Sequence, residues 1–226
     1  AQFCIMATGC LSVPQEPRFP GVDSFKGRSY HTGRWPHQPV DFTGQRVGVI
    51  GTGSSAIQSI PLIAAQAAHL YVFQRTANYS VPAENRPLDP EFVREFKARY
   101  PELRRQARES RNGLIMERND QSALEVTAEE RTRQFERRWT RGGLGFSAAF
   151  TDLLTNQAAN DTAAEFFHWK IRAAVRDADV AALLSPRDYP VGTKRMCVDS
   201  DYYATFNRDN VTLVDVRSAP IEAITP

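Results

Sequence analysis

The segment Gly51-Thr52-Gly53-Ser54-Ser55-Ala56 constrains the fold of this chain more than any other. A hydrophobic run over 46–50 precedes it and indicates a buried strand. Ile57, Ile60 and Ile63/Ala64 then recur at three- and four-residue spacing, which is typical of a helix packed on a sheet. A second strand is expected over 70–73. Strand, glycine turn, helix and strand in this order predict the first half of a Rossmann unit.

The small residues of the turn have distinct physical roles. Gly51 permits a tight backbone turn, Gly53 lets the backbone approach a pyrophosphate, and Ala56 allows close packing of helix and strand. Free N–H groups at the start of the helix face the anion, and the hydroxyls of Ser54 and Ser55 add donors there. Glycine loops also occur as plain turns, but between a strand and a helix this one predicts a nucleotide site.

The end of the second strand indicates which nucleotide binds. An NAD site carries Asp or Glu there, which accepts hydrogen bonds from the ribose hydroxyls. This chain has Gln74 and Arg75 instead, and a guanidinium suits a 2′-phosphate. The alternative is a surface arginine at a strand end. The missing acidic residue and the added cation together favour NADPH.

Composition argues against several classes of partner. The sequence has 28 Lys+Arg and 26 Asp+Glu, so its charge does not indicate nucleic acid or an anionic membrane as a partner. No hydrophobic run approaches the ~20 residues that span a bilayer, and no signal peptide is evident. Cys4, Cys10 and Cys197 lack metal-binding spacing. We therefore expect reduced thiols, no metal and a cytoplasmic location.

Residues 87–185 have a helical pattern. Capping sequences begin helices at Asp89 and Thr127, and another helix is expected from about Thr162. Arginine-rich runs between 104 and 141 alternate with glutamates, which favours solvated helical faces over phosphate binding. We interpret the region as a helical insertion that shapes a substrate cavity.

Both ends of the chain are hydrophobic and strand-like, over Phe3–Ala7 and Ile221–Ile224. Domains seldom begin and end inside core elements, so we expect a segment of a longer protein. Cys4 is expected to pack as a small hydrophobic residue in the first of these strands.

A second motif, over 25–36, reads F-x-G-x-x-x-H-x-x-x-W-P. It resembles the fingerprint of type I Baeyer–Villiger monooxygenases, flavoenzymes that use FAD, NADPH and O2 to convert ketones to esters or lactones. The resemblance covers almost the whole chain and is strongest at 25–36, 47–61, 70–82 and 186–221. The matching fingerprint residues are Phe25, Gly27, His31, Trp35 and Pro36.

Glycine and proline in this motif predict a linker, anchored by its aromatic residues. His31 on such a linker is expected to hydrogen-bond the backbone and help domains move, with catalysis by it the minority interpretation. The other histidines show no metal-binding spacing.

The resemblance also implies roles for the G-x-K-R segment. Lys194 would complete the 2′-phosphate site with Arg75, and Arg195 would be the catalytic residue over the flavin. Sequence alone leaves a surface Lys-Arg pair as the alternative. The implied cofactors are FAD and NADPH, and the implied substrates are a ketone and O2. The expected cofactor-binding residues are Gly51, Thr52, Gly53, Ser54, Ser55, Gln58, Arg75 and Lys194.

The predicted fold class is α/β: a Rossmann-type NADPH-binding domain with a helical insertion, plus a remnant of an FAD-binding domain. No upstream glycine motif for FAD is present, so we expect the chain by itself to be inactive. The predicted divisions are the FAD-domain remnant 1–24, the fingerprint linker 25–39, the NADPH-binding domain 40–86 and 186–226, and the insertion 87–185.

Two other functions fit part of this pattern. Flavin-containing N- or S-oxygenating monooxygenases share the nucleotide turns and a related F-x-G-x-x-x-H string. The pairs Trp35-Pro36 and Lys194-Arg195 argue against them. A stand-alone, non-catalytic NADP-binding module is the other alternative.

Overall fold

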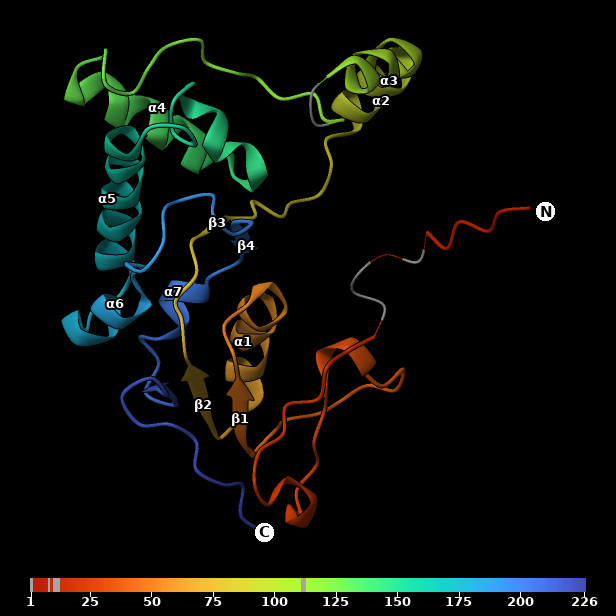
Figure 1. Ribbon diagram of the computed structural model, residues 1–226, viewed down its shortest axis with the longest axis vertical. Helices are drawn as coiled ribbons and strands as arrows, with labels where there is room; N and C mark the ends of the chain where they lie inside the picture. The colour runs from red at the N-terminus through yellow and green to blue at the C-terminus, as the bar shows by residue number, and fades with distance from the viewer. Residues whose placement is uncertain (1, 8, 10–12, 111–112) are drawn as a thin grey trace.

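The computed structural model describes residues 2–7, 9, 13–110 and 113–226. It has an α/β architecture, with a small parallel sheet at one end and a group of helices at the other (Figure 1). The elements in chain order are β1 (Arg46–Ile50), α1 (Ser54–Gln66), β2 (His69–Gln74), β3 (Ser80–Pro82), α2 (Pro90–Ala98), α3 (Tyr100–Glu109), α4 (Ala128–Arg141), α5 (Gln157–Ala174), α6 (Ala178–Leu184), β4 (Cys197–Asp199), α7 (Tyr202–Thr205) and β5 (Val211–Asp215).

The main sheet has three parallel strands in the order β1-β2-β5. In its register Val49 pairs with Val72, and Val72 pairs with Leu213. Helix α1 crosses from β1 to β2, and the chain between β2 and β5 carries α2 to α7. This is the strand order of half a Rossmann sheet, which confirms the predicted fold class.

Strand β1 is less buried than the sequence predicted. Its residues alternate between exposed and half-buried, and the side chain of Ile50 is 48% exposed. Among the described strands, β1 pairs only with β2, so its other edge has no neighbour to cover it. The hydrophobic run over 46–50 predicted the strand correctly but not its burial.

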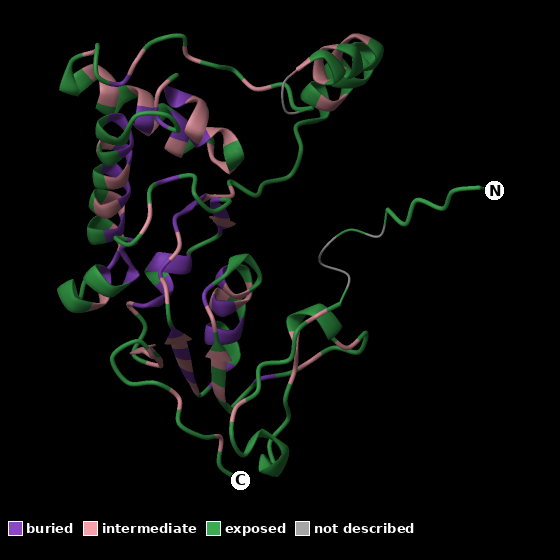
Figure 2. Ribbon diagram, viewed as in Figure 1, coloured by how far each residue is buried: buried purple, intermediate pink, exposed green. Residues whose placement is uncertain are grey.

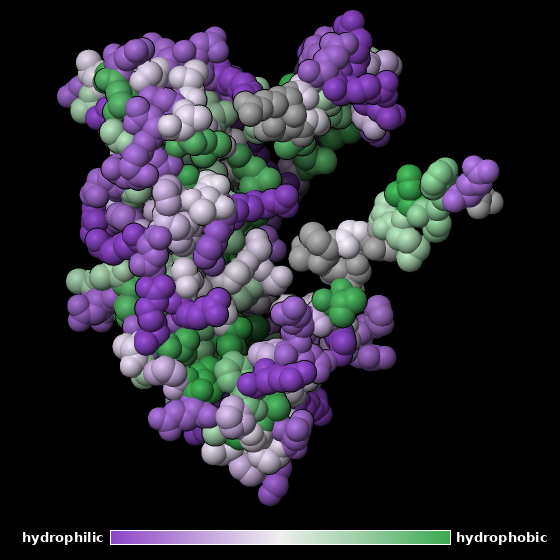
Figure 3. Space-filling view, viewed as in Figure 1, coloured by the Kyte–Doolittle hydropathy of each residue, from purple (hydrophilic) through white to green (hydrophobic). Residues whose placement is uncertain are grey.

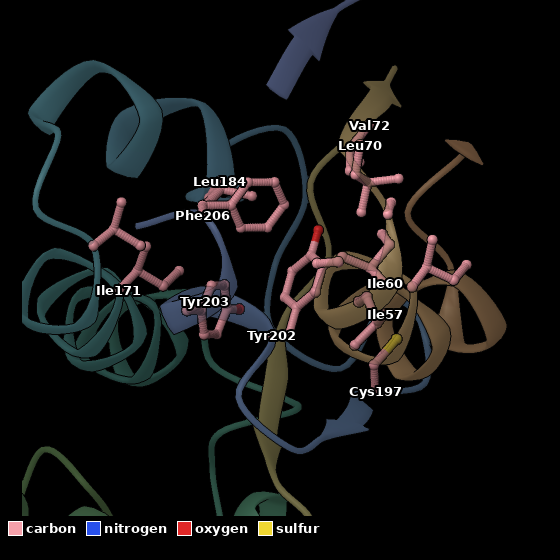
Figure 4. Close-up of a cluster of buried hydrophobic side chains, with 14 of the residues drawn as sticks. Ile57, Ile60, Leu70, Val72, Ile171, Leu184, Cys197, Tyr202, Tyr203 and Phe206 are labelled. Atoms are coloured by element: carbon pink, nitrogen blue, oxygen red, sulfur yellow. The ribbon is translucent and has the colours of Figure 1, made fainter. Parts of the chain in front are cut away.

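The first hydrophobic core lies where α1 and β2 meet α7 (Figure 4). Ile57 and Ile60 of α1 are fully buried, as their spacing predicted, and they share this core with Leu70 and Tyr202. Full burial of a large hydrophobic side chain contributes roughly 1.5–3 kcal/mol. This core therefore holds the glycine turn at a fixed place above the sheet.

A second, aromatic core fills the helical end of the molecule. Phe135 of α4 stacks on Phe146 with ring centroids 5.3 Å apart, and Phe146 lies 4.7 Å from Phe167 of α5. Tyr79, just before β3, packs against Phe167 with ring centroids 5.1 Å apart. Helix α5 belongs to both cores, because its Ile171 packs in the first. Helices α4 and α5 are thus joined to the sheet through the two cores that α5 shares.

Three expectations about local structure were wrong. Phe3–Ala7 forms no strand and Cys4 is exposed, because no neighbouring strand is present among the described residues to satisfy its backbone. Ile221–Ile224 also forms no strand; the Ile224 N–H donates to the carbonyl oxygen of Pro20 at 2.8 Å. Cys10 and Arg111 lie outside the described residues.

The helices also differ from expectation in detail. Helix α5 begins at Gln157, ahead of Thr162, because the side chain of Asn156 caps it by accepting from the Ala159 N–H at 3.3 Å. The Thr127 cap of α4 is confirmed, with its hydroxyl accepting from the Glu130 N–H at 3.2 Å. Arg138 is only 5% exposed, contrary to the solvated face expected of its run.

Helices α2 and α3 form a hairpin that stands away from the rest of the chain (Figure 1). None of their residues is buried, and the hairpin is largely exposed in Figure 2. Its outward surface is hydrophilic in Figure 3. None of the helices in the described part of the chain is long and apolar enough to cross a membrane.

Asp199, the last residue of β4, is a buried carboxylate between the two cores. It accepts hydrogen bonds from the Ser80 hydroxyl and from the Tyr202 N–H at 3.0 Å. Burial nevertheless raises the pKa of Asp199 above its ordinary value of 3.8. The folded protein then holds this proton more tightly than the unfolded chain does. The stability gained in this way is present below about pH 4 and is lost as pH rises through the raised pKa.

We therefore expect Asp199→Asn to flatten the pH dependence of the free energy of unfolding above about pH 4. Urea unfolding at a series of pH values up to neutrality measures it. The matched control is Asp209→Asn at an exposed aspartate, which should keep the wild-type slope of unfolding free energy against pH. If the slope of unfolding free energy against pH were unchanged in Asp199→Asn, a group other than Asp199 would account for the pH dependence.

Candidate functional site

The glycine turn lies at the carboxyl end of β1 and leaves open space around its backbone. Gly51 has φ +103°, a conformation that a residue with a side chain rarely adopts, and its N–H donates to the carbonyl oxygen of Phe73 at 2.9 Å. A Cβ atom added at Gly51 or Gly53 would meet nothing within 4 Å. Among the residues that the structure describes, no side chain caps the N-terminus of α1 at Gly53. The turn therefore offers free N–H groups and room for an anion.

A chain of hydrogen bonds ties this turn to the segment that follows β2. The Thr52 hydroxyl donates to the carbonyl oxygen of Thr76 at 2.9 Å, and the Asn78 amide donates to the carbonyl oxygen of Thr52 at 2.6 Å. The Tyr189 hydroxyl donates to the carbonyl oxygen of Ala77 at 2.8 Å and lies 3.0 Å from Asn78 Oδ1. Residues far apart in the sequence thus form one rim around the turn.

The segment after β2 places Gln74 and Arg75 in different environments. Gln74 is buried, and its side-chain amide donates to the carbonyl oxygen of Leu183 at 2.8 Å, so it faces the interior. Arg75 is exposed at the end of the strand. Only the arginine is therefore available to a ligand.

The loop that carries Lys194 and Arg195 is held by helix α5. The side chain of Asn160 accepts from the Val191 N–H at 2.9 Å and donates to the Val191 carbonyl oxygen at 2.8 Å. Gly192 then has φ +91°, and a Cβ there would lie 2.4 Å from the side chain of Leu154. The helical region thus fixes the start of the cationic loop.

Both cations of the loop are exposed. The Lys194 ammonium lies 4.3 Å from the centroid of the Tyr189 ring. Within the described part of the chain, no carboxylate lies at ion-pair distance from Arg75, Lys194 or Arg195. These three positive charges are therefore not neutralised by the protein, which favours an anionic ligand.

Strand β4 lies against the start of α1, next to the glycine turn. Cys197 is buried, and this burial raises the pKa of its thiol, while a hydrogen bond from Ser54 opposes the rise. Gln58 donates from its side-chain amide to the carbonyl oxygen of Val198 at 3.2 Å. Gln58, a candidate cofactor ligand, is thus partly engaged in holding α1 against β4.

The fingerprint segment packs beside the sheet. Trp35 lies 5.5 Å from the ring of Tyr30 and 6.3 Å from that of Phe42, which belongs to the first core. His31 Nδ1 accepts from the Gly33 N–H at 3.0 Å, so its Nε2–H donates to the carbonyl oxygen of Gln15 at 3.2 Å. The expected backbone hydrogen bonds of His31 are thus present.

Two other fingerprint residues meet directly. A Cβ at Gly27 would lie 2.4 Å from the ring of Phe25, so only glycine allows the ring to lie over this backbone. Phe25 is 44% exposed and Trp35 is 42% exposed, so the aromatic anchors are only partly covered. Pro36 is half-buried next to Trp35.

The predicted residues therefore fall into two groups. The hydrogen bonds of Thr52, Asn78 and Tyr189 join the glycine turn, the segment after Arg75 and the Lys194 loop. The fingerprint residues form a separate cluster that packs on the first core through Phe42. Sequence reasoning missed Asn78, Asn160 and the role of Tyr189, because an isolated polar residue carries no periodic signal, whether it lies in a loop or, like Asn160, on a helix. The only hint was the position of Tyr189 just before the G-x-K-R segment.

Comparison with known proteins gives matches over the whole chain. A family model described as flavin-binding monooxygenase-like matches residues 3–96. A 2-oxo-Δ3-4,5,5-trimethylcyclopentenylacetyl-CoA monooxygenase of Pseudomonas putida is 43% identical over 100% of this chain and 43% of its own length. A cyclohexanone 1,2-monooxygenase of an Acinetobacter species is 45% identical over 100% of this chain and 41% of its own length.

A third relative is named for a different oxygenation. A phenazine N-monooxygenase of Lysobacter antibioticus is 39% identical over 100% of this chain and 41% of its own length. The chain thus spans between 41% and 43% of the length of these curated relatives.

Solved structures match equally well. A structure of oxidized steroid monooxygenase bound to NADP has a TM-score of 0.90 and 57% identity, over 94% of this chain and 40% of that one. A structure of OTEMO in complex with FAD and NADP has a TM-score of 0.94 and 42% identity, over 97% of this chain and 42% of that one. At these identities the likeness extends beyond the fold.

Proposed function

Because this chain belongs to the Baeyer–Villiger type of flavin-binding monooxygenases, we propose that it supplies the NADPH-binding crevice and a catalytic guanidinium for ketone oxygenation. The enzyme would use NADPH, FAD and O2 to convert a ketone to an ester or lactone. One observation carries the proposal: the open glycine turn is tied to the unneutralised cations Arg75 and Lys194 through the Thr52, Asn78 and Tyr189 hydrogen bonds.

The residues around the turn fit NADPH. Gly51 and Gly53 leave space for the pyrophosphate, and the uncapped start of α1, with the hydroxyls of Ser54 and Ser55, would donate to it. Arg75 would pair with the 2′-phosphate in a bidentate manner, and the second charge comes from Lys194. Thr52 and Gln58 would line the crevice while they hold its walls together.

Arg195 is the residue to which we assign catalysis. When bound and reduced by NADPH, FAD would supply the reaction with O2 that provides the inserted oxygen atom. An arginine side chain keeps its positive charge at any working pH, so Arg195 would stabilise negative charge that develops beside the ketone carbonyl without giving up its proton.

The fingerprint residues would act on the position of the crevice rather than on the chemistry. His31 is engaged with the backbone at both ring nitrogens, and Trp35 packs toward the core through Phe42. We assign them to a linker over 25–39, between an FAD-domain remnant over 1–24 and the NADPH-binding domain over 40–86 and 186–226. The helical insertion is 87–185.

The proposed partners are a ketone and O2, with no nucleic acid. The proposed location is cytoplasmic.

N-oxygenation is the second candidate, because one relative is named as a phenazine N-monooxygenase. The same crevice would serve both reactions, which differ in the atom that receives oxygen. The protein expressed from its complete gene should be incubated with NADPH and either ketones or N-heteroaromatic compounds. We expect esters from the ketones, with about one NADPH consumed per ester formed. N-oxides without esters would favour the second candidate.

Gly53→Ala tests whether the pyrophosphate approaches this backbone. Gly53 has φ −80° and the added methyl group meets no protein atom within 4 Å, so folding should be unchanged. In the complex the methyl group would occupy the approach to the phosphate, and we expect NADP+ affinity to fall about tenfold or more.

Titration calorimetry of NADP+ measures this loss, and thermal unfolding checks the fold. Gly145→Ala, in the helical region, is the matched control, since a Cβ there would lie 3.9 Å from Arg138 and no closer to any atom. Equal NADP+ affinity in Gly53→Ala and Gly145→Ala would place the pyrophosphate elsewhere.

A further inference from the structure

We propose that Tyr189 is a positioning residue that holds the Lys194 ammonium for the 2′-phosphate and so sets the preference for NADPH over NADH. The inference rests on the proposed function, in that it assumes the 2′-phosphate binds between Arg75 and Lys194. It concerns selectivity between the two nucleotides, and it adds a residue to which no ligand contact has been assigned.

The contact that carries it is the position of Lys194 over the Tyr189 ring, with the ammonium 4.3 Å from the ring centroid. At this distance the electron-rich face of the ring attracts the cation. Within the described part of the chain, no carboxylate competes for the ammonium at ion-pair distance. The ring is thus the feature that fixes where this charge lies.

The ring itself is held on two sides. Its hydroxyl donates to the Ala77 carbonyl oxygen at 2.8 Å, beside Asn78, and its edge meets the ring of Tyr79 with centroids 5.6 Å apart. Burial raises the pKa of Tyr189 to about 12. At working pH the hydroxyl therefore keeps the proton with which it makes this bond. Because Ala77 follows Arg75 closely, the same side chain connects the two phosphate-binding cations.

This arrangement has a selective consequence. A lysine side chain is flexible, and ordering it on a ligand costs conformational entropy. A ring that holds the ammonium in place beforehand removes part of that cost for a ligand that uses the charge. NADPH uses it through the 2′-phosphate, whereas NADH has only a ribose hydroxyl there. Tyr189 should therefore favour NADPH and leave NADH affinity nearly unchanged.

The test is titration calorimetry with NADP+ and NAD+ on the protein expressed from its complete gene. We expect Tyr189→Leu to weaken NADP+ binding about fivefold and NAD+ binding by less than about twofold. Tyr189→Phe keeps the ring and should retain most of the preference for NADP+. If Tyr189→Leu does not fold, Tyr189→Met gives the same comparison, because it also removes the ring.

Tyr100→Leu is the matched control. Tyr100 lies on the α2–α3 hairpin, with the Arg104 guanidinium 5.7 Å from its ring centroid, so the substitution removes a similar pair outside the crevice. Both affinities should stay at wild-type values. In a Lys194→Met background, Tyr189→Leu should have no further effect on NADP+, because the charge it positions is gone.

Equal weakening of NADP+ and NAD+ by Tyr189→Leu would overturn the inference, since a merely structural role affects both nucleotides. A full fivefold loss in the Lys194→Met background would overturn it as well. The oxygenation proposal fails on a different result. A protein that binds NADP+ with this selectivity but forms no ester would contradict ketone oxygenation and leave the role of Tyr189 intact.

Discussion

Arg195→Ala should lower ester formation from a ketone by a factor of about 10²–10³ or more, while NADP+ affinity stays within about twofold of the wild type. The side chain is exposed, and within the described residues it makes no ion pair, so removing it leaves no buried charge unpaired. Its proposed role is to stabilise negative charge only during the reaction. Such a contribution appears in kcat rather than in cofactor binding.

Single-turnover formation of ester, followed by mass spectrometry, measures the first quantity, and calorimetry with NADP+ measures the second. Arg195→Lys should not restore the rate, because an ammonium is a compact point charge that can release its proton and lacks the planar fork of arginine. Arg105→Ala, on the exposed hairpin, is the control for loss of one surface arginine. Ester formation at the wild-type rate in Arg195→Ala would remove the catalytic assignment.

The double substitution Arg75→Ala with Lys194→Met should abolish the preference for NADPH. A hydrogen bond to a charged group contributes roughly 1.5–3 kcal/mol, so loss of two such contacts in a solvated crevice predicts about a 100-fold fall in kcat/KM for NADPH. NADH has no 2′-phosphate, and its kcat/KM should change by less than about threefold.

Initial rates with both nucleotides measure this change in the ratio of kcat/KM. Each single variant should show part of this change. Because Tyr189 contacts both Lys194 and the segment after Arg75, the effects of the two single substitutions should not be strictly additive. A parallel loss with NADH would indicate damage to the pyrophosphate site. Unchanged preference in the double variant would mean that the 2′-phosphate binds elsewhere.

Much of the fold could be predicted from the sequence because its signals are local. Isoleucine spacing in α1 and the hydrophobic runs of β1 and β2 are properties of neighbouring residues, and the glycine turn joins them directly. The cap at Thr127 is equally local. Each of these was expected and each is present.

The rest depends on partners distant in the sequence. Phe3–Ala7 has the composition of a strand, but a strand forms only where another strand accepts its hydrogen bonds. Arg138 has the same local surroundings as its exposed neighbours, yet its position on α4 buries it, with its guanidinium donating to the carbonyl oxygen of Ala148 at 3.2 Å. No pattern within either segment distinguishes these outcomes.

The candidate site, too, could be predicted from the sequence only in part. The spacing of the glycine turn pointed to Gly51 and Gly53, and the resemblance at the G-x-K-R segment pointed to Lys194 and Arg195; the roles of all four are proposals. Their supports come from elsewhere: Asn160 on α5 clamps the cationic loop more than 30 residues away in sequence. The helical insertion was expected to shape a substrate cavity, which stays a prediction. Its Asn160 hydrogen-bonds to Val191 and so holds the start of the loop that carries the two cations.

The most direct test of oxygen insertion is the fate of labelled oxygen. The protein expressed from its complete gene should be incubated with FAD, NADPH, a cyclic ketone and 18O2, and the product examined by mass spectrometry. The account predicts a lactone with one 18O atom in the ring, the other atom of O2 leaving as water, at the expense of NADPH oxidised to NADP+. NADPH oxidation that yields only hydrogen peroxide, or a lactone without 18O, would contradict it.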